Sequence, residues 1–173
     1  MLGMFKKKTA PVPAGPFQFE VAVEVEKPAA DVYPLIDWAD RRNSKRELGH
    51  IVETLGSDPR RFRLIMTDMP DHRFDMTVIR EERGYAYSFV TDIQPRVGRL
   101  DSDEENYVIE PLGADRCKLR LTCNVTFIGG MTMDELEGEL MMMTMACQRA
   151  LIKLKVHAEM GVEAVRSLEG EIG

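Results

Sequence analysis

Few residues of this sequence are placed where they could do chemistry. Tyr85 and Tyr87 alternate with Phe89 in a strand-like run, so both are expected on its inward side. Their hydroxyls could orient a ligand carbonyl, or they could be core aromatics whose hydroxyls reach the rim. His50 is a candidate general base, but no carboxylate is spaced to orient it. No catalytic residue is assigned.

The cysteines and the remaining histidines give no metal-ligand pattern. His72 is expected in a turn and His157 late in a C-terminal helix, which sets the histidines far apart in the predicted fold. The three cysteines are odd in number and have no CxxC spacing, so we expect reduced thiols. Cys123 and Cys147 could approach each other between a strand and the helix, although a buried cysteine is usually a small apolar filler. We expect neither a metal nor a cofactor.

Methionines are the most unusual feature of the composition. They number 12, and six lie close together around the start of the C-terminal helix: Met131, Met133, Met141, Met142, Met143 and Met145. Flexible thioethers adapt to varied apolar ligands or to a protein groove, and they also fill irregular cores. Core filling, ligand lining and a homodimer contact therefore all stay open.

Length and charge limit the class of protein. A chain of 173 residues is the size of one domain. Its net charge of -6, with no basic block, disfavours a nucleic-acid partner. The longest apolar run, Leu140 to Ala146, is too short for a transmembrane segment. Residues 1–16 carry three lysines without a following apolar stretch, so we expect a flexible N-terminal tail, a single domain over 17–173 and a cytoplasmic location.

The first elements are expected to be a strand and a short helix. Apolar residues alternate with polar ones over Phe17–Val25, which is typical of a half-buried antiparallel strand. A short helix follows from Pro28 to Trp38, with Pro34 bending it, and a polar loop or single turn extends to Lys45.

The middle of the chain reads as a meander of short strands, which gives seven strands in all. The segments around Ile51 and Tyr107 supply two of the strands. Apolar residues share one face in the other four runs: Phe62, Leu64 and Met66; Phe74, Met76 and Val78; Tyr85, Tyr87 and Phe89; Cys117, Leu119, Leu121, Cys123, Val125 and Phe127. Turns are expected between them at Gly56–Pro59, Pro70–Asp71, Glu82–Gly84, Pro95–Gly98 and Pro111–Asp115.

A long helix is expected to close the chain. Thr132 and Glu135 form a capping-box pattern, and apolar residues recur at helical spacing to about Leu168, with Gly161 a weak point. Such a helix would be roughly 50 Å long, so its last turns would project or pack on a partner. On the helix, the side chains expected to face the sheet are Leu140, Met143 and Cys147, and those expected in solvent are Glu139 and Arg149.

The entry to the first helix resembles a known family. The Phe19-to-Glu26 strand runs directly into Lys27-Pro-Ala-Ala-Asp-Val-Tyr33, which is similar to the packing motif of the START-like, or SRPBCC, superfamily of polyketide cyclases and birch-pollen-allergen-type proteins. The resemblance implies an α+β helix-grip fold, with a curved seven-stranded antiparallel sheet wrapped around the long helix. It also implies a lipid- or polyketide-like ligand between sheet and helix.

The predicted function is therefore the binding of a small hydrophobic molecule. The expected ligand-binding residues are Trp38, Leu64, Met66, Met76, Val78, Tyr87, Phe89, Met143 and Cys147. Two alternatives stay open. One is a cyclase or dehydratase in which Tyr87 or His50 assists proton transfer, and the other is an interaction module that docks the methionine-rich helix on another protein.

Overall fold

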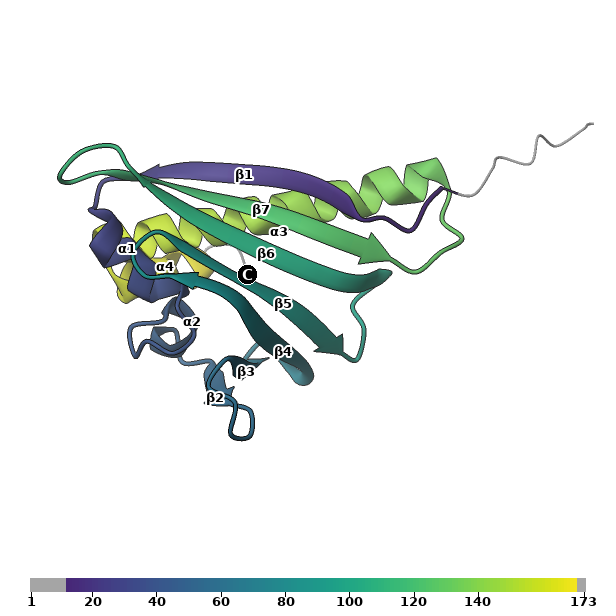
Figure 1. The fold of residues 1–173 in the computed structure, drawn as a ribbon, viewed down its shortest axis with the longest axis horizontal. Helices are drawn as coiled ribbons and strands as arrows, with labels where there is room; N and C mark the ends of the chain where they lie inside the picture. The colour runs from purple at the N-terminus through teal and green to yellow at the C-terminus, as the bar shows by residue number, and fades with distance from the viewer. Residues whose placement is uncertain (1–11, 171–173) are drawn as a thin grey trace, which may run out of the picture.

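A computed structural model describes residues 12–170 as one curved sheet, one long helix and three short helices (Figure 1). The elements follow in the order β1 Phe17–Val25, α1 Ala29–Ile36, α2 Ser44–Glu47, β2 Ile51–Thr54, β3 Arg61–Met66, β4 Met69–Glu82, β5 Ala86–Gln94, β6 Leu100–Pro111, β7 Cys117–Phe127, α3 Met133–Met160 and α4 Val162–Gly170.

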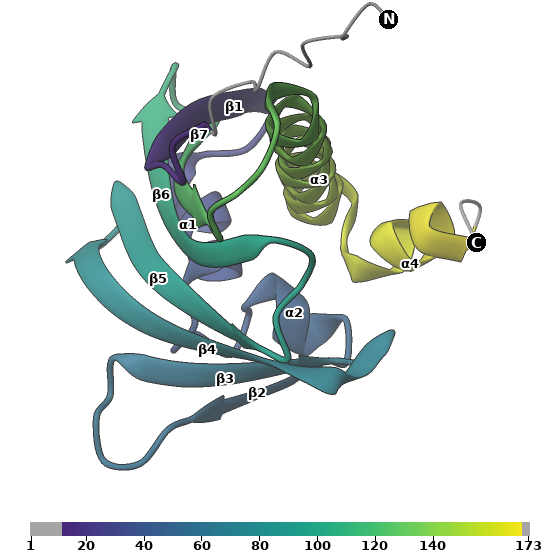
Figure 2. The ribbon, with the colours of Figure 1, turned by 90° about the vertical axis from the view of Figure 1, so that its right-hand side faces the viewer.

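The predicted seven-stranded antiparallel sheet is confirmed. Its strand order is β1-β7-β6-β5-β4-β3-β2, so the chain returns once, to pair β1 with β7, and otherwise forms a meander. Every inward residue of β7 is buried, while the residues between them are half-buried. Figure 2 shows the sheet curving around α3, which is the helix-grip arrangement.

The segment before β1 joins the sheet within the described residues. The Phe127 backbone N–H donates to the Ala14 carbonyl at 2.7 Å, and Val12 packs against the core. Of the predicted tail, residues 1–11 lie outside the described residues, while Ala14 is hydrogen-bonded to β7.

One expected turn and one residue expected on the inward face lie elsewhere. Met66 pairs with Met69, so the hairpin loop is the two residues between them and the turn predicted at Pro70–Asp71 is wrong. His72 consequently lies in β4 and not in a turn. Tyr85 is 46% exposed because Glu82 pairs with Ala86, which leaves Tyr85 in the loop and off the inward face.

The C-terminal helix starts as predicted and ends earlier. Thr132 Oγ1 accepts from the Glu135 N–H at 3.3 Å, and Glu135 Oε2 accepts from the Thr132 N–H at 2.7 Å, which confirms the capping box. The helix ends at Met160 because Gly161 adopts φ +89°, a conformation that favours glycine. A continuous helix to Leu168 is therefore wrong. The helix α4 turns away from the α3 axis and packs beside α3 with Val165 buried (Figure 2).

The expected faces of α3 are correct with one exception. Leu140, Met143 and Cys147 pack against the core, and Arg149 is exposed. Glu139 is half-buried and not fully solvated, because its carboxylate lies against Gly98 in the β5–β6 loop.

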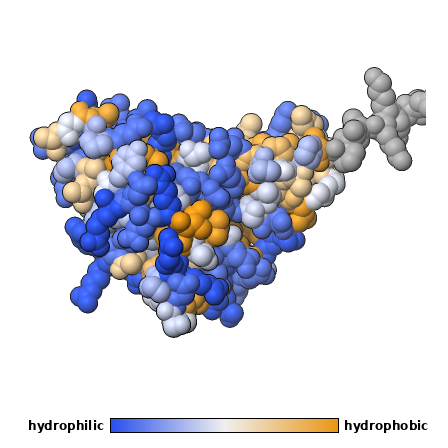
Figure 3. Space-filling view, viewed as in Figure 1, coloured by the Kyte–Doolittle hydropathy of each residue, from blue (hydrophilic) through white to orange (hydrophobic). Residues whose placement is uncertain are grey.

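The methionine cluster divides between the two sides of α3. Met131 and Met143 face the core, whereas Met133, Met141, Met142 and Met145 are exposed. Figure 3 shows hydrophobic atoms at the end of the molecule where α3 begins. No helix within residues 12–170 is long and apolar enough to cross a membrane.

Candidate ligand-binding cavity

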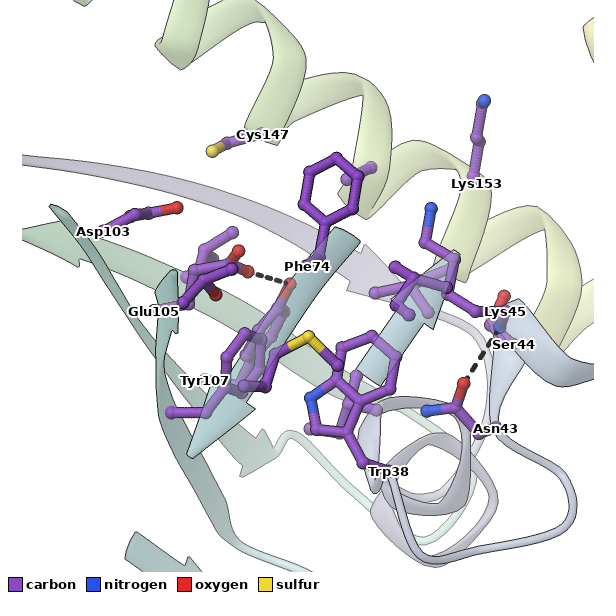
Figure 4. A pocket seen from close by; sticks show the side chains of 18 of the residues that line it. Trp38, Asn43, Ser44, Lys45, Phe74, Asp103, Glu105, Tyr107, Cys147 and Lys153 are labelled. Carbon is purple, nitrogen blue, oxygen red and sulfur yellow. Dashed lines mark hydrogen bonds between the residues drawn. The ribbon is translucent and has the colours of Figure 1, made fainter. Parts of the chain in front are cut away.

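A cavity of about 350 Å³ lies between the concave face of the sheet and α3. Strands β3 to β7 supply its floor, α3 covers it, and the segment from α1 through α2 closes one end (Figure 4). Most of its wall is apolar, including Leu35, Ile36, Phe74, Ile93, Leu121, Ala146 and Leu154. A space of this size between sheet and helix is within the usual range for a small-molecule site.

Seven of the nine predicted ligand-binding residues lie on the cavity wall. These are Trp38, Leu64, Met66, Met76, Phe89, Met143 and Cys147. Val78 and Tyr87 are buried but do not line the cavity. Both face inward from β4 and β5, as predicted, but they lie beyond the end of the cavity. Alternation with a period of two predicts which face of a strand a residue is on, and not its position along the strand.

Tyr87 is a core residue that holds the loop after α1. Its hydroxyl accepts from the Trp38 backbone N–H at 3.2 Å, and its ring packs edge-on against Tyr33 with centroids 6.1 Å apart. Burial raises the pKa of Tyr87 well above its ordinary value. The hydroxyl therefore stays protonated and has a structural role.

Trp38 forms part of the cavity wall and is the only tryptophan of the chain. Its ring packs edge-on against Phe89 at 5.5 Å between centroids, and Arg46 binds its backbone carbonyl at 2.9 Å. The indole Nε1 is buried and has no hydrogen-bond partner among the described residues. Trp38 is thus a rigid wall residue and a built-in fluorescent reporter.

Two carboxyl groups in the cavity were not predicted. Asp103 and Glu105 are two residues apart on β6 and line the cavity together with Tyr107 (Figure 4). The Tyr107 hydroxyl donates to Glu105 Oε2 at 2.7 Å. Counting back by two from Tyr107 would have placed both acids on the inward face, but an acidic residue at an inward position is unusual enough to be missed.

Burial controls the charge of this pair. Desolvation, followed by the charges of Glu105 and Glu104, raises the pKa of Asp103 to about 8. Desolvation also raises the pKa of Glu105, against the hydrogen bond from Tyr107 and the charge of Lys45. The cavity therefore holds acids that exchange protons nearer to neutral pH than ordinary carboxyls do.

Two lysines lie on the helical side of the cavity. Lys45 is the second residue of α2. Desolvation and the charge of Lys153 lower the pKa of Lys45. Lys153 pairs with Glu169 of α4 at 2.6 Å. Asp103 and Glu105 lie on the opposite side of the cavity from Lys45 and Lys153 (Figure 4), so the two signs of charge occupy separate parts of the wall.

A buried hydrogen-bonded chain ties α2 to α3 beside the cavity. His157 Nε2 lies 2.6 Å from Glu47 Oε2, and His157 Nδ1 lies 2.9 Å from Ser44 Oγ. Because a carboxylate only accepts, Nε2 donates to Glu47, while Nδ1 shares the second hydrogen bond with the Ser44 hydroxyl. Residue 157 is far in sequence from residues 44 and 47, and periodicity alone could not bring it to them.

The remaining candidates are outside the cavity or have no catalytic setting. His50 is not on the wall; its Nδ1 accepts from the Thr67 backbone N–H at 3.2 Å, and burial lowers its pKa. Cys123 and Cys147 do approach, with Sγ atoms 3.6 Å apart. Their mutual hydrogen bond and burial raise the pKa of Cys123, so Cys123 is an unreactive thiol.

Comparison with known proteins gives a fold and no closer relative. No protein-family model matches the chain, and no curated protein matches it. Among solved structures, the chain is similar to the allergen Ara h 8.0201, with a TM-score of 0.61 and 10% identity over 82% of this chain and 97% of that one. The chain has the START-like, or SRPBCC, helix-grip fold.

Two further helix-grip structures agree with this assignment. A START superfamily protein from Mycobacterium smegmatis has a TM-score of 0.52 and 18% identity over 79% of this chain and 98% of that one. The di-domain ARO/CYC protein BexL has a TM-score of 0.61 and 16% identity over 85% of this chain and 46% of BexL. At these identities the likeness establishes the helix-grip fold and does not carry over an activity.

Proposed function

We propose that this protein binds one small, largely apolar molecule, lipid- or polyketide-like, in the cavity between the sheet and α3. The observation that carries the proposal is the cavity itself: about 350 Å³ of space with a mainly apolar wall and few polar groups. An ordinary core is close-packed and leaves no such space. The helix-grip fold, which the chain shares with an ARO/CYC protein, supports the same function.

A fluorescence titration tests this function. A neutral naphthalene dye such as Prodan should bind with saturation at one molecule per chain, quench Trp38, and be displaced by decan-1-ol. The competing explanation is binding to the exposed methionines of α3, so the Met141→Gln, Met142→Gln double variant is the matched control and should bind the dye unchanged. Absence of saturable binding, or its loss in the control variant, would contradict the proposal.

The second candidate function is an enzyme in which Asp103, and not Tyr87 or His50, transfers the proton. Tyr87 and His50 do not line the cavity, so neither is positioned to act on a cavity ligand. Asp103 has its pKa raised to about 8, and a carboxyl that titrates near neutral pH is suited to general acid–base work. Turnover of a bound cyclisable or dehydratable substrate, abolished by Asp103→Asn, would favour this candidate over simple binding.

Three further properties of this protein are predictions from its sequence. These are the cytoplasmic location, the homodimer contact and the docking role of the methionine-rich helix. The exposed side chains of Met133, Met141, Met142 and Met145 are compatible with either use of the helix surface.

A further inference from the structure

One end of the cavity is acidic, and one of its oxygen atoms has no partner. Asp103 is only 8% exposed, lines the cavity, and its Oδ1 is buried without a hydrogen-bond partner among the described residues. Glu105, two residues along the same strand, has one oxygen engaged by the Tyr107 hydroxyl. Figure 4 shows both carboxyl groups inside the wall, on the opposite side of the cavity from Lys45.

A carboxyl oxygen in this position is costly for the empty protein. A buried acceptor without a donor loses its hydration and gains nothing in return. Two neighbouring carboxyls in an apolar setting also disfavour the charged state of each other. A ligand that brings a donor and a positive charge would remove both penalties at once.

We propose, on the basis of the cavity-binding function above, that the ligand carries a basic nitrogen, and that its protonated amine binds Asp103 and Glu105 while its apolar body fills the cavity. An alkylammonium group has three N–H donors, enough for both carboxyls. Hydrogen bonds between an ammonium and a carboxylate are about twice as strong as neutral ones. The ligand class is therefore an apolar amine.

The lysines do not favour an acidic ligand to the same extent. Lys153 is already paired with Glu169 at 2.6 Å. Lys45 has no ion pair among the described residues, but its burial and the charge of Lys153 act against its protonated state. A ligand carboxylate would thus meet one weakened cation, and it would lie in the same cavity as two acids.

The size of the cavity selects the probes. At about 350 Å³, the cavity is at the small end of the range for small-molecule sites, which suits probes with a ten-carbon chain. Decylamine, decan-1-ol and decanoate have this size and the same chain, and they differ only in the polar end. Each would compete with the neutral dye at pH 7 and low salt.

Decylamine should displace the dye at a concentration at least about tenfold lower than decan-1-ol or decanoate needs. Asp103→Asn and Glu105→Gln should each reduce this advantage to less than about threefold, measured as the ratio of decylamine to decan-1-ol displacement within the same variant. Asp92→Asn, which changes an exposed carboxylate on the adjacent strand β5, should keep the full advantage. If one cavity variant fails to fold by circular dichroism, the other carries the test.

The failures can be told apart. Dye binding with equal displacement by all three probes would overturn the amine inference and leave the cavity-binding function standing. Tightest binding by decanoate would also overturn it and would point to Lys45 instead. Absence of dye and probe binding in the parent protein would overturn the cavity-binding function, and the amine inference with it.

Discussion

At the residue scale, Tyr87 belongs to the core and not to the cavity wall. Tyr87 accepts the buried Trp38 N–H at 3.2 Å and does not line the cavity. Tyr87→Phe should therefore cost about 1 to 3 kcal/mol in the free energy of unfolding, since it leaves that N–H without a partner. Dye affinity should stay within about twofold of the parent protein. Urea unfolding and dye titration measure both, and a large loss of affinity at unchanged stability would place Tyr87 in the site after all.

Asp103 predicts a pH dependence of stability. Its pKa is raised from 3.8 to about 8 in the folded state, so the folded protein binds more protons than the unfolded chain between these values. The free energy of unfolding should therefore fall as pH rises from about 4 to about 8. Asp103→Asn should flatten this slope and stabilise the protein at pH 8 by more than about 1.4 kcal/mol, the equivalent of one pKa unit.

Urea unfolding at pH 5 and pH 8 measures this slope. The exposed carboxylate of Asp92 supplies the control, because Asp92→Asn should leave the slope of the parent protein unchanged. Parallel slopes for the parent protein and Asp103→Asn would show that Asp103 is not a buried acid.

Individual site residues were predictable only in part. Alternation put Met76 and Phe89 on the inward face, and both line the cavity. The same rule could not tell that Tyr87, two residues before Phe89, lies beneath α1. Asp103 was missed because burying a carboxyl costs its hydration, so an acidic residue is not expected at an inward position and no hydrophobic pattern indicates it.

At the scale of elements, α3 has one face in the core and one in solvent. Leu151 is fully buried, while its neighbour Ile152 is 40% exposed. Leu151→Ala should cost about 2 to 5 kcal/mol through lost burial and a cavity, and Ile152→Ala should cost under about 0.5 kcal/mol. Thermal unfolding of the two variants compares neighbours that differ by one step of the helix. Equal losses would contradict the assigned face.

The elements themselves were largely predictable, and their ends were not. Period-two runs located β1 and β7, and the capping box located the start of α3. The fold of α4 beside α3 depends on the φ of Gly161 and on the burial of Val165. Sequence periodicity continues through such a break, because both helices keep an apolar stripe.

At the scale of the whole molecule, the fold follows from the order of elements and the cavity follows from their packing. Strand, short helix, meander and long helix were enough to predict the helix-grip architecture. A ligand space between sheet and helix was expected from the resemblance, but its volume could not be predicted, because it depends on how far α3 stands from the sheet. Most predicted wall residues, among them Trp38 and Met143, do line the cavity, whereas Asp103 and Glu105 had to be read from the structure.

The cavity is tested most directly by filling it. Met76 is buried on β4 and lines the cavity, while Ile79 is exposed on the same strand. Met76→Trp should abolish binding of the neutral dye and cost less than about 1 kcal/mol of stability, because the added ring enters open space. Ile79→Trp should bind the dye as the parent protein does. If Met76→Trp costs about 1 to 3 kcal/mol, as overpacking of a closed core does, and dye binding is the same with and without it, the protein has no ligand cavity at this site.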